Sequence, residues 1–557
     1  MNINSSIIRS LEKENRAYHE DSRCDICTPE LAVRRGTWTT VEGLSSLEHG
    51  GIPVYYDGEK VLLLPYSHTL VTGSTGTGKS EVIYKNQIRL LAKLPEAIRP
   101  SFLITDLKGD ISQEQAEYLR GNGYEVLVFD MRNPYRSTRY NFLLQVFDDY
   151  LEALELERRL KGGQIRNEFE GVHYSTIREA QAAANAKRLT ILDSIERTLT
   201  DLSHIMIPLD DPKDGMWVSG ARTMLKAIIH TMLRDAKNPD TGMIRETFTI
   251  SNVCRAAYST RNDCDELVSW LQQAEDILCV KNAISANYRI NAKVTRDGYV
   301  SSLNTSIGEY TSSSIAALTA TSDEINLREV ARSEKPYAIF VITDDRQKAT
   351  NSICMQLINN LLSELTTAAD ASPAHSLSRD FIILADEFAN MPALPNLANK
   401  ITTLRSRRIW MMMAIQSAQQ LRLVYGDDVS EIIHDNCDLH LFVGCNNDET
   451  KERFARSMGR RLGVKTSFNM SNDNNVAVTK GTEDVPVIRK SDLDALELGQ
   501  FYIRSRLSQN MRSEMLPHFR QPHDDEPPLR PERHRPFDPD EFVYDIYKVV
   551  KKLGLSW

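Results

Sequence analysis

The sequence contains no apolar run long enough to cross a membrane, because a spanning helix needs roughly 18 to 20 consecutive apolar residues. Its best candidates, Val61–Pro65 followed by Thr69–Val71, and the run Ile409–Ile415, are too short or are interrupted by polar residues. Residues Met1–Glu14 have no apolar core, which excludes a signal peptide or an anchor in that stretch. We therefore expect a cytoplasmic protein with no transmembrane segment.

Cysteine is scarce, since the 557 residues include eight, too few for a disulfide framework. Only Cys24 and Cys27 have the spacing of metal ligands, and a zinc site would need a second pair, which does not follow at a suitable distance. His19 and His49 are the residues that could complete such a site. We interpret the two cysteines as free thiols.

The sequence also has no excess of basic residues over acidic ones. The net charge is −9, from 67 basic and 76 acidic residues, whereas a protein that binds nucleic acid over its whole surface is usually basic. Any nucleic-acid contact must therefore be local, in a pore or groove. The hydrophobic content of 41% is typical of a soluble globular protein, and the length allows roughly two to four domains.

Short apolar runs alternate with amphipathic segments between Gly51 and Leu143, which is the pattern of a parallel sheet with crossover helices. The runs predicted to be strands are Val61–Leu64 with Thr69–Thr72, Phe102–Thr105 and Glu125–Phe129. The segments with helical spacing are Glu81–Ala92 and Ser112–Gly121.

Helical patterns then dominate as far as Thr321, and the strand pattern returns in four later apolar runs. Those runs are Tyr337–Thr343, Phe381–Ala385, Ile409–Ile415 and Leu439–Val443. We therefore predict an α/β fold with a doubly wound, mainly parallel sheet, split by an inserted all-α domain. The predicted domains are an extension (1–50), the first half of a nucleotide-binding domain (51–146), the helical insertion (147–325), the second half (326–515) and a Pro- and charge-rich linker with a C-terminal helix (516–557).

Two further segments have distinctive compositions. Ser467–Asp484 is polar and rich in Asn, so we expect a mobile loop there. Asp540–Leu553 is amphipathic, so we expect a helix that docks on a partner or packs on the body of the protein.

One glycine-rich string matches the phosphate-binding pattern G-x-x-x-x-G-K-[ST], after an apolar strand and before a helix. Glycines let successive backbone N–H groups point at phosphate oxygens, and the helix N-terminus adds partial positive charge. We predict that the lysine reaches the terminal phosphates of ATP and that the serine hydroxyl binds Mg²⁺. The residues are Gly73, Ser74, Thr75, Gly76, Thr77, Gly78, Lys79 and Ser80.

Two carboxylates follow the apolar strand Phe381–Ala385, as in a Walker B element. Asp386 is predicted to hold Mg²⁺ through water, and Glu387 to polarise the attacking water, which indicates hydrolysis and not binding alone. Gln416 follows the apolar strand Ile409–Ile415 and is a candidate reader of the γ-phosphate. A capping or turn role for Gln416 is nearly as well supported.

Three arginines, Arg405, Arg407 and Arg408, lie between the two polar strand ends. In ring ATPases an arginine from a neighbouring subunit stabilises the charge that develops on the phosphoryl group. A solvated basic face, or contacts with nucleic-acid phosphates, explains the same residues about equally well.

With these motifs the chain resembles the type IV secretion coupling proteins, the TraG/TraD-like motors of bacterial conjugation. The resemblance runs from about Gly51 to about Phe519. Its strings, in order, are Ile104–Asp110, Gly123–Asp130, Tyr140–Leu143, Asp214–Trp217, Leu384–Asn390, Leu404–Arg407, Ala414–Ser417, Asn436–Asp438, Gly444 and Asn447–Thr450. Leu107 and Asp110 stand where the family usually has proline and glutamate.

The resemblance implies a RecA-like P-loop NTPase domain with an inserted helical domain, assembled as a homo-hexamer. It implies an ATP-hydrolysing, DNA-translocating motor that delivers relaxase-bound DNA, single- or double-stranded, to a type IV secretion channel. Arg405 matches the family's arginine finger, and Gln416 its polar sensor. Family members usually carry transmembrane helices before the phosphate loop, so we expect a separate membrane anchor protein to hold this chain at the inner face of the membrane, or a soluble motor.

Two alternatives remain open at this stage. One is an FtsK/HerA-like DNA pump for segregation, packaging or processing, although the long helical insertion between Lys79 and Asp386 favours the coupling proteins. The other is a docking receptor for relaxase or effector proteins that binds ATP only to assemble. The complete set of Lys79, Ser80, Asp386, Glu387, Arg405 and Gln416 argues against a degenerate ATPase.

Overall fold

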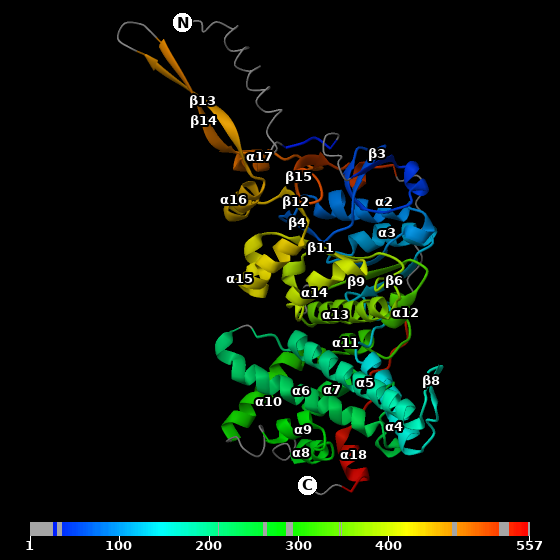
Figure 1. Ribbon diagram of the computed structural model, residues 1–557. Helices are drawn as coiled ribbons and strands as arrows, with labels where there is room; N and C mark the ends of the chain where they lie inside the picture. The colour runs from blue at the N-terminus through cyan, green and yellow to red at the C-terminus, as the bar shows by residue number, and fades with distance from the viewer. Residues whose placement is uncertain are drawn as a thin grey trace.

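The computed structural model describes residues 26–29, 36–209, 211–259, 265–285, 293–344, 346, 348–470, 476–522 and 534–554. Cys24 and His19 lie outside these ranges, so the suggested Cys24–Cys27 pair stays a prediction. A nine-stranded sheet forms the upper part of the molecule, and a helical domain lies below it (Figure 1).

The strands of the large sheet follow the order β16-β15-β12-β4-β11-β10-β5-β9-β6. Their bounds are β4 Thr69–Gly73, β5 Ser101–Thr105, β6 Glu125–Asp130, β9 Tyr337–Ile342, β10 Phe381–Ala385, β11 Ile409–Ile415, β12 Leu439–Gly444, β15 Gln500–Ser505 and β16 Met511–Glu514. Strands β12 to β6 in this order are all parallel, and β15 and β16 add an antiparallel edge. The predicted strands from Phe102 onward are confirmed.

Both faces of this sheet are buried, which explains why its strands are continuous apolar runs. Ile383 and Met411 point into one core, whereas their neighbours Ile382 and Met412 point into the other. The first core includes residues of α13 (Lys348–Ala371) and α14 (Leu397–Leu404), and the second includes residues of α2 (Lys85–Ala92) and α3 (Asp110–Gly121). The mainly parallel, doubly wound α/β fold is therefore confirmed.

A small three-stranded sheet packs on the second core. It consists of β1 (Thr37–Thr40), β2 (Ile52–Tyr56) and β3 (Lys60–Leu64), all antiparallel. The prediction that Val61–Leu64 joins the same parallel sheet as Thr69–Thr72 is therefore wrong. An apolar run alone does not say which strand pairs with it, and the reversal of the chain at Gly58, with φ of +110°, makes β2 and β3 a hairpin.

Helices dominate between β6 and β9. Their bounds are α4 Leu144–Lys161, α5 Ile177–Met206, α6 Gly215–Asp235, α7 Ile250–Ala257, α8 Asp265–Gln272, α9 Leu278–Ile284, α10 Lys293–Ile307, α11 Ser313–Leu318 and α12 Leu327–Arg332; a short hairpin, β7 Glu168–Phe169 with β8 Val172–His173, precedes α5. The long helix α5 begins with a capping box, in which Thr176 and Glu179 satisfy each other's backbone N–H groups. The predicted domain boundaries themselves stay predictions.

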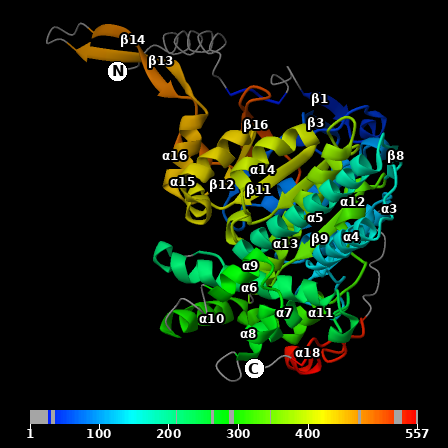
Figure 2. The same ribbon diagram turned by 60° about the horizontal axis from the view of Figure 1, so that its bottom comes forward.

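A long hairpin projects from the body beside the sheet, as both views show (Figures 1 and 2). It is formed by β13 (Arg460–Met470) and β14 (Val476–Pro486), which follow α15 (Ala418–Asn436) and α16 (Asp448–Ser457) and precede α17 (Lys490–Asp494). The mobile loop predicted at Ser467–Asp484 is therefore wrong for residues 467–470 and 476–484, which form strands, and residues 471–475 lie outside the described residues. Cross-strand pairing in register stabilises this mostly polar segment.

The C-terminal segment crosses from the sheet to the far end of the helical domain, where α18 (Ile546–Lys552) packs on α8 (Figure 2). Tyr544 donates a hydrogen bond to Asp235 of α6, and Trp270 of α8 donates another at 2.7 Å. The predicted C-terminal helix therefore packs on the body of the protein, which was one of its two expected roles. None of the helices in the described part of the chain is both long and apolar enough to span a bilayer.

Candidate functional site

The carboxyl ends of five neighbouring parallel strands, β12, β4, β11, β10 and β5, meet at one edge of the large sheet. Ligands of open α/β sheets bind at this kind of edge. The phosphate-loop string follows β4, Asp386 and Glu387 follow β10, and Gln416 follows β11. Segments more than 300 residues apart in the sequence are brought together here, as the motifs predict.

The glycine-rich loop has the backbone shape that its glycines allow. Gly76 and Gly78 have φ values of +84° and +90°, a region that favours glycine. A Cβ on Gly78 would lie 2.6 Å from Cδ1 of Leu498. The loop is tied to the next strand, because the N–H of Ser74 donates to the carbonyl O of Gly444 at 2.8 Å.

The helix after the loop starts with a turn of π-helix, Lys79–Tyr84, and continues as α2. Such turns occur often at functional sites. Together the two segments form a helix whose N-terminal end faces the loop, so its partial positive charge favours an anion there.

Lys79 is 7% exposed, and its Nζ donates to the carbonyl O of Gly73 at 2.6 Å and of Ser74 at 3.3 Å. Burial lowers the pKa of Lys79, while the charges of Asp386 and Glu387 raise it. Lys79 is therefore within electrostatic reach of both carboxylates, as the phosphate-site prediction requires.

Asp386 is anchored through its backbone to the neighbouring strand β5. Its N–H donates to Oγ1 of Thr105 at 2.7 Å. Burial, opposed by the charge of Lys79 and reinforced by that of Glu387, raises the pKa of Asp386 to about 6. A buried carboxylate in this environment is stabilised by a bound cation.

Glu387 has φ of +49° and ψ of +46°, a left-handed conformation that is uncommon for glutamate. Its Oε2 accepts a hydrogen bond from Nδ2 of Asn390. Backbone strain of this kind concentrates at functional sites, where the surrounding structure holds it in place. The turn directs the chain out of the strand immediately after the two carboxylates.

Gln416 lies at the same edge, where its side-chain Oε1 accepts a long hydrogen bond, 3.4 Å, from Nε2 of Gln420. Its carbonyl O accepts from Sγ of Cys445, the residue after β12. The next residue, Ser417, caps α15. The geometry therefore leaves both the sensor role and the turn role of Gln416 open.

Arg405 lies at the opposite edge of the sheet, because it precedes β11 whereas the phosphate loop follows β4. It is 55% exposed in its side chain and pairs with Asp438 at 2.8 Å. Arg407 pairs with Asp370 and Arg408 with Asp380, so their side chains are engaged within the chain. Of the three predicted arginines, Arg405 has the largest exposed fraction.

Asp106 and Lys108 lie in the string Ile104–Asp110, to which the sequence analysis gave no role. Arg132 was not identified from the sequence. Asp106, at the end of β5, is 1% exposed and accepts hydrogen bonds from the N–H groups of Gly109 and Ser112 at 2.8 and 2.7 Å. The charge of Lys108 lowers the pKa of Lys79, which places Lys108 beside the site. The position of Asp106 after a buried strand was the available signal.

Arg132 holds the segment that carries these residues. Its guanidinium donates to the carbonyl O of Leu107, to that of Lys108 at 2.6 Å and to that of Thr343 at 3.1 Å. Three carbonyls from two loops are thus fixed by one side chain. No residue type or spacing near Arg132 in the sequence predicts this contact.

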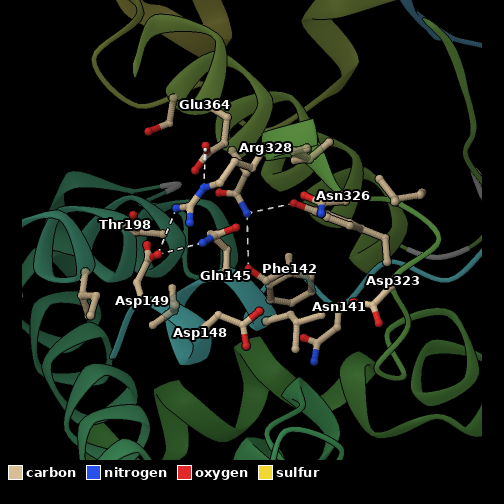
Figure 3. Close-up of a pocket in the computed structure, with 18 of the residues that line it drawn as sticks. Asn141, Phe142, Gln145, Asp148, Asp149, Thr198, Asp323, Asn326, Arg328 and Glu364 are labelled. Carbon is tan, nitrogen blue, oxygen red and sulfur yellow. Dashed lines mark hydrogen bonds and ion pairs between the residues drawn. The ribbon is translucent and has the colours of Figure 1, made fainter. Parts of the chain in front are cut away.

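A separate cavity of about 240 Å³ lies below the sheet, between α4, α12 and α13 (Figure 3). Arg328 pairs there with Asp149 at 2.9 Å and with Glu364 at 3.4 Å. Arg245 pairs with Asp148 and Asp323. Four carboxylates against two arginines make this lining unsuited to a phosphate, so the strand ends remain the candidate nucleotide site.

Comparisons with known proteins agree with this geometry. The protein-family model for type IV secretory system conjugative DNA transfer matches residues 16–483. A search of the curated proteins found no match.

Three of the solved structures that this chain resembles are crystal forms or complexes of the bacterial conjugative coupling protein TrwB. The unbound form is 15% identical, with a TM-score of 0.55 over 88% of this chain and 95% of that one. The complex with ADP and Mg²⁺ is 14% identical, with a TM-score of 0.55 over 88% and 93%. The complex with the ATP analogue ADPNP is 14% identical, with a TM-score of 0.55 over 91% and 97%. At such identities the likeness establishes the fold.

Proposed function

The chain belongs to the type IV secretory system conjugative DNA transfer family, and on this premise we propose that it is an ATP-hydrolysing motor that moves DNA toward a secretion channel. The observation that carries the proposal is the meeting of the phosphate loop with Asp386 and Glu387 at one sheet edge. Binding alone needs the loop, whereas hydrolysis needs a carboxylate beside it to prepare water.

The residues present fit ATP with Mg²⁺. The hydroxyl of Ser80 and the carboxylate of Asp386 are the hard oxygen ligands that Mg²⁺ takes, and burial of Asp386 favours a cation beside it. When bound, the ion would neutralise negative charge on the phosphate oxygens. The solved TrwB structures that contain ADP and Mg²⁺, or ADPNP, support this assignment.

The side chains then have distinct roles. The backbone N–H groups of Gly73–Ser80 hold the phosphates, and Lys79 balances charge on the terminal ones. Glu387 orients the attacking water and accepts its proton. Gln416 senses the γ-phosphate from the adjacent strand. Arg405 stabilises the transferred phosphoryl group in the site of a neighbouring copy.

The partners follow from the family. We propose that single- or double-stranded DNA stimulates hydrolysis, that relaxase or relaxosome proteins deliver it, and that components of the secretion channel or a separate membrane anchor protein receive the chain at the inner membrane face. A homo-hexameric ring suits a net charge of −9, because DNA then meets only the residues that face the central pore. The helical domain between β6 and β9 is the proposed substrate-facing part.

The test is ATP turnover by the full chain with and without single- and double-stranded DNA, for the wild type and Glu387→Gln. We expect DNA to raise turnover and Glu387→Gln to lower it by at least about 100-fold while nucleotide binding is retained. Glu48→Gln is the matched control and leaves turnover unchanged, because Glu48 is an exposed glutamate that belongs to none of the segments forming the proposed ATP site. Wild-type turnover in Glu387→Gln overturns the hydrolytic assignment, and turnover indifferent to DNA overturns the motor.

A further inference from the structure

Three side chains with metal-ligating atoms meet in the helical domain, away from the proposed ATP site. They are Glu196 of α5, His230 of α6 and Cys279 of α9, and one ligand atom from each lies within 4.8 Å of the others. None has a role in the chemistry assigned above.

The helices hold these groups at the rim of the domain core. Helix α6 packs against both α5 and α9. The residues next to the three, such as Ile195, Ile229 and Val280, are buried, while the three themselves are partly exposed. An ion can therefore enter from solvent, and a water molecule can complete its coordination.

The carboxylate of Glu196 is already oriented by two neighbours on α6. Its Oε2 lies 2.8 Å from Nε2 of His230, and its Oε1 accepts a hydrogen bond from Nζ of Lys226 at 2.6 Å. Lys226 also donates to Oγ1 of Thr200, one helical turn beyond Glu196, at 3.2 Å. With Lys226 on Oε1, Oε2 is the oxygen turned toward His230.

We propose that Glu196, His230 and Cys279 bind a zinc ion or a chemically equivalent divalent transition ion, with water as the fourth ligand. Carboxylate oxygen, imidazole nitrogen and thiolate sulfur are the donor types that Zn²⁺ takes in proteins. Bonds of about 2.0 to 2.3 Å to a tetrahedral ion require ligand atoms roughly 3.3 to 3.8 Å apart, which small side-chain rotations reach from the present spacing.

The charges and protons of this site balance. The thiolate of Cys279 and the carboxylate of Glu196 together match the charge of the dication, and neutral His230 adds none. Binding forms bonds from the metal to the sulfur of Cys279, a nitrogen of His230 and a carboxylate oxygen of Glu196 in place of water molecules of the hydrated ion. It releases the thiol proton of Cys279, and any proton on the ligating nitrogen of His230, to solvent. Lys226 touches the carboxylate and not the ion, so it is a positioning residue.

The consequence is a link between the three helices α5, α6 and α9. An ion that binds only the folded domain raises its unfolding temperature. The inference does not depend on the proposed ATPase activity, and its test uses no hydrolysis assay.

The test is titration of the metal-free, nucleotide-free full chain with Co²⁺, followed by displacement with Zn²⁺. We expect one thiolate-to-cobalt absorption band per chain, which disappears in Cys279→Ser. Cys254→Ser is the matched control, because Cys254 is a buried cysteine of the same domain that donates to the carbonyl O of Ile307. It keeps the band.

Two further variants keep the test decisive if Cys279→Ser folds poorly. His230→Gln lowers Zn²⁺ affinity at least tenfold, measured by competition with a fluorescent chelator, and Glu196→Gln, which removes one negative charge from the site, also lowers it but keeps the cobalt band. The double variant Cys24→Ser/Cys27→Ser separates this site from the other cysteine pair and keeps the band. A band that survives Cys279→Ser or is lost in the double variant overturns the proposal, as does the absence of any band in the wild type.

Discussion

Arg405 and Asp438 form an ion pair at the amino-terminal edge of the large sheet, with 2.8 Å between Nη1 and Oδ2. Arg405 precedes β11, and Asp438 immediately precedes β12. Strand β11 has seven residues, so at about 3.3 Å per residue the pair lies roughly 20 Å from the phosphate loop of the same chain. Arg405 is therefore too far away to contact a nucleotide bound to its own phosphate loop, and the proposed role of Arg405 requires a neighbouring copy. Asp438 holds the Arg405 side chain at this edge.

Replacing Arg405 tests this arrangement. Arg405→Ala is expected to lower ATP turnover by about 10³-fold, the size of effect that arginine fingers supply, with nucleotide affinity nearly unchanged. Arg407→Ala is the matched control, because Arg407 lies two residues away and pairs with Asp370. Its turnover should equal that of the wild type. Equal losses in the two variants would contradict a specific role for Arg405.

Arg132 should matter for turnover although it lies outside every motif. Arg132→Met removes the donors that hold the carbonyls of Leu107, Lys108 and Thr343, and so frees the loop that places Lys108 beside Lys79. We expect kcat to fall about 10- to 100-fold with a smaller change in KM. Arg120→Met, which removes an ion pair with Glu117 on α3, is the comparison. An unchanged kcat in Arg132→Met would refute the positioning role.

The C-terminal segment should stabilise the helical domain through one buried carboxylate. Asp235 is 4% exposed, burial raises its pKa, and Tyr544 donates to it. Tyr544→Phe removes that donor and is expected to cost about 1 to 3 kcal/mol in the free energy of unfolding, measured with urea. Lys552→Ala, on the same terminal helix but in an exposed pair with Asp240, should change it by less than about 1 kcal/mol. Equal stabilities of Tyr544→Phe and the wild type would contradict the account.

The buried histidines should lower the free energy of unfolding as the pH falls below about 6.5. Burial lowers the pKa of both His68 and His440 to about 4, so between pH 6.5 and 4 the unfolded chain binds protons that the folded chain does not. Each buried histidine then costs about 2 kcal/mol at pH 5 relative to pH 7. The difference between the urea midpoints at pH 5 and pH 7 should be smaller for His440→Gln than for the wild type. The exposed His173→Gln should behave as the wild type does, and an unchanged pH dependence in His440→Gln would show that His440 is not the cause.

The sequence predicted the strands that carry the site because both of their faces are buried. Phe381–Ala385 and Ile409–Ile415 are uninterrupted apolar runs, and their predicted bounds equal those of β10 and β11. Polar residues directly after such runs lie at one sheet edge whenever the strands are parallel, so Asp386, Glu387 and Gln416 were placed without coordinates.

Most of the parts that could not be predicted depend on contacts distant in the sequence. The hairpin of β13 and β14 is an exception, because its pairing is local, but its apolar residues are scattered among polar ones and the Asn-rich stretch beside them indicated a loop. Arg132 binds backbone carbonyl groups of other loops, and every residue has such a group, so no residue type marks the contact. The cluster of Glu196, His230 and Cys279 joins three helices, and no fixed spacing marks it. The ion pair of Arg405 with Asp438 joins residues that precede two different strands, and no motif predicts it.

The most direct test of a site shared between copies is a mixing experiment with Lys79→Ala and Arg405→Ala. Each variant alone should hydrolyse ATP at a small fraction of the wild-type rate. In a head-to-tail ring of both, about a quarter of the interfaces combine an intact Lys79 with an intact Arg405, so an equal mixture should recover up to about a quarter of wild-type turnover. A mixture as inactive as its components, at concentrations where the wild type is fully active, would contradict the account.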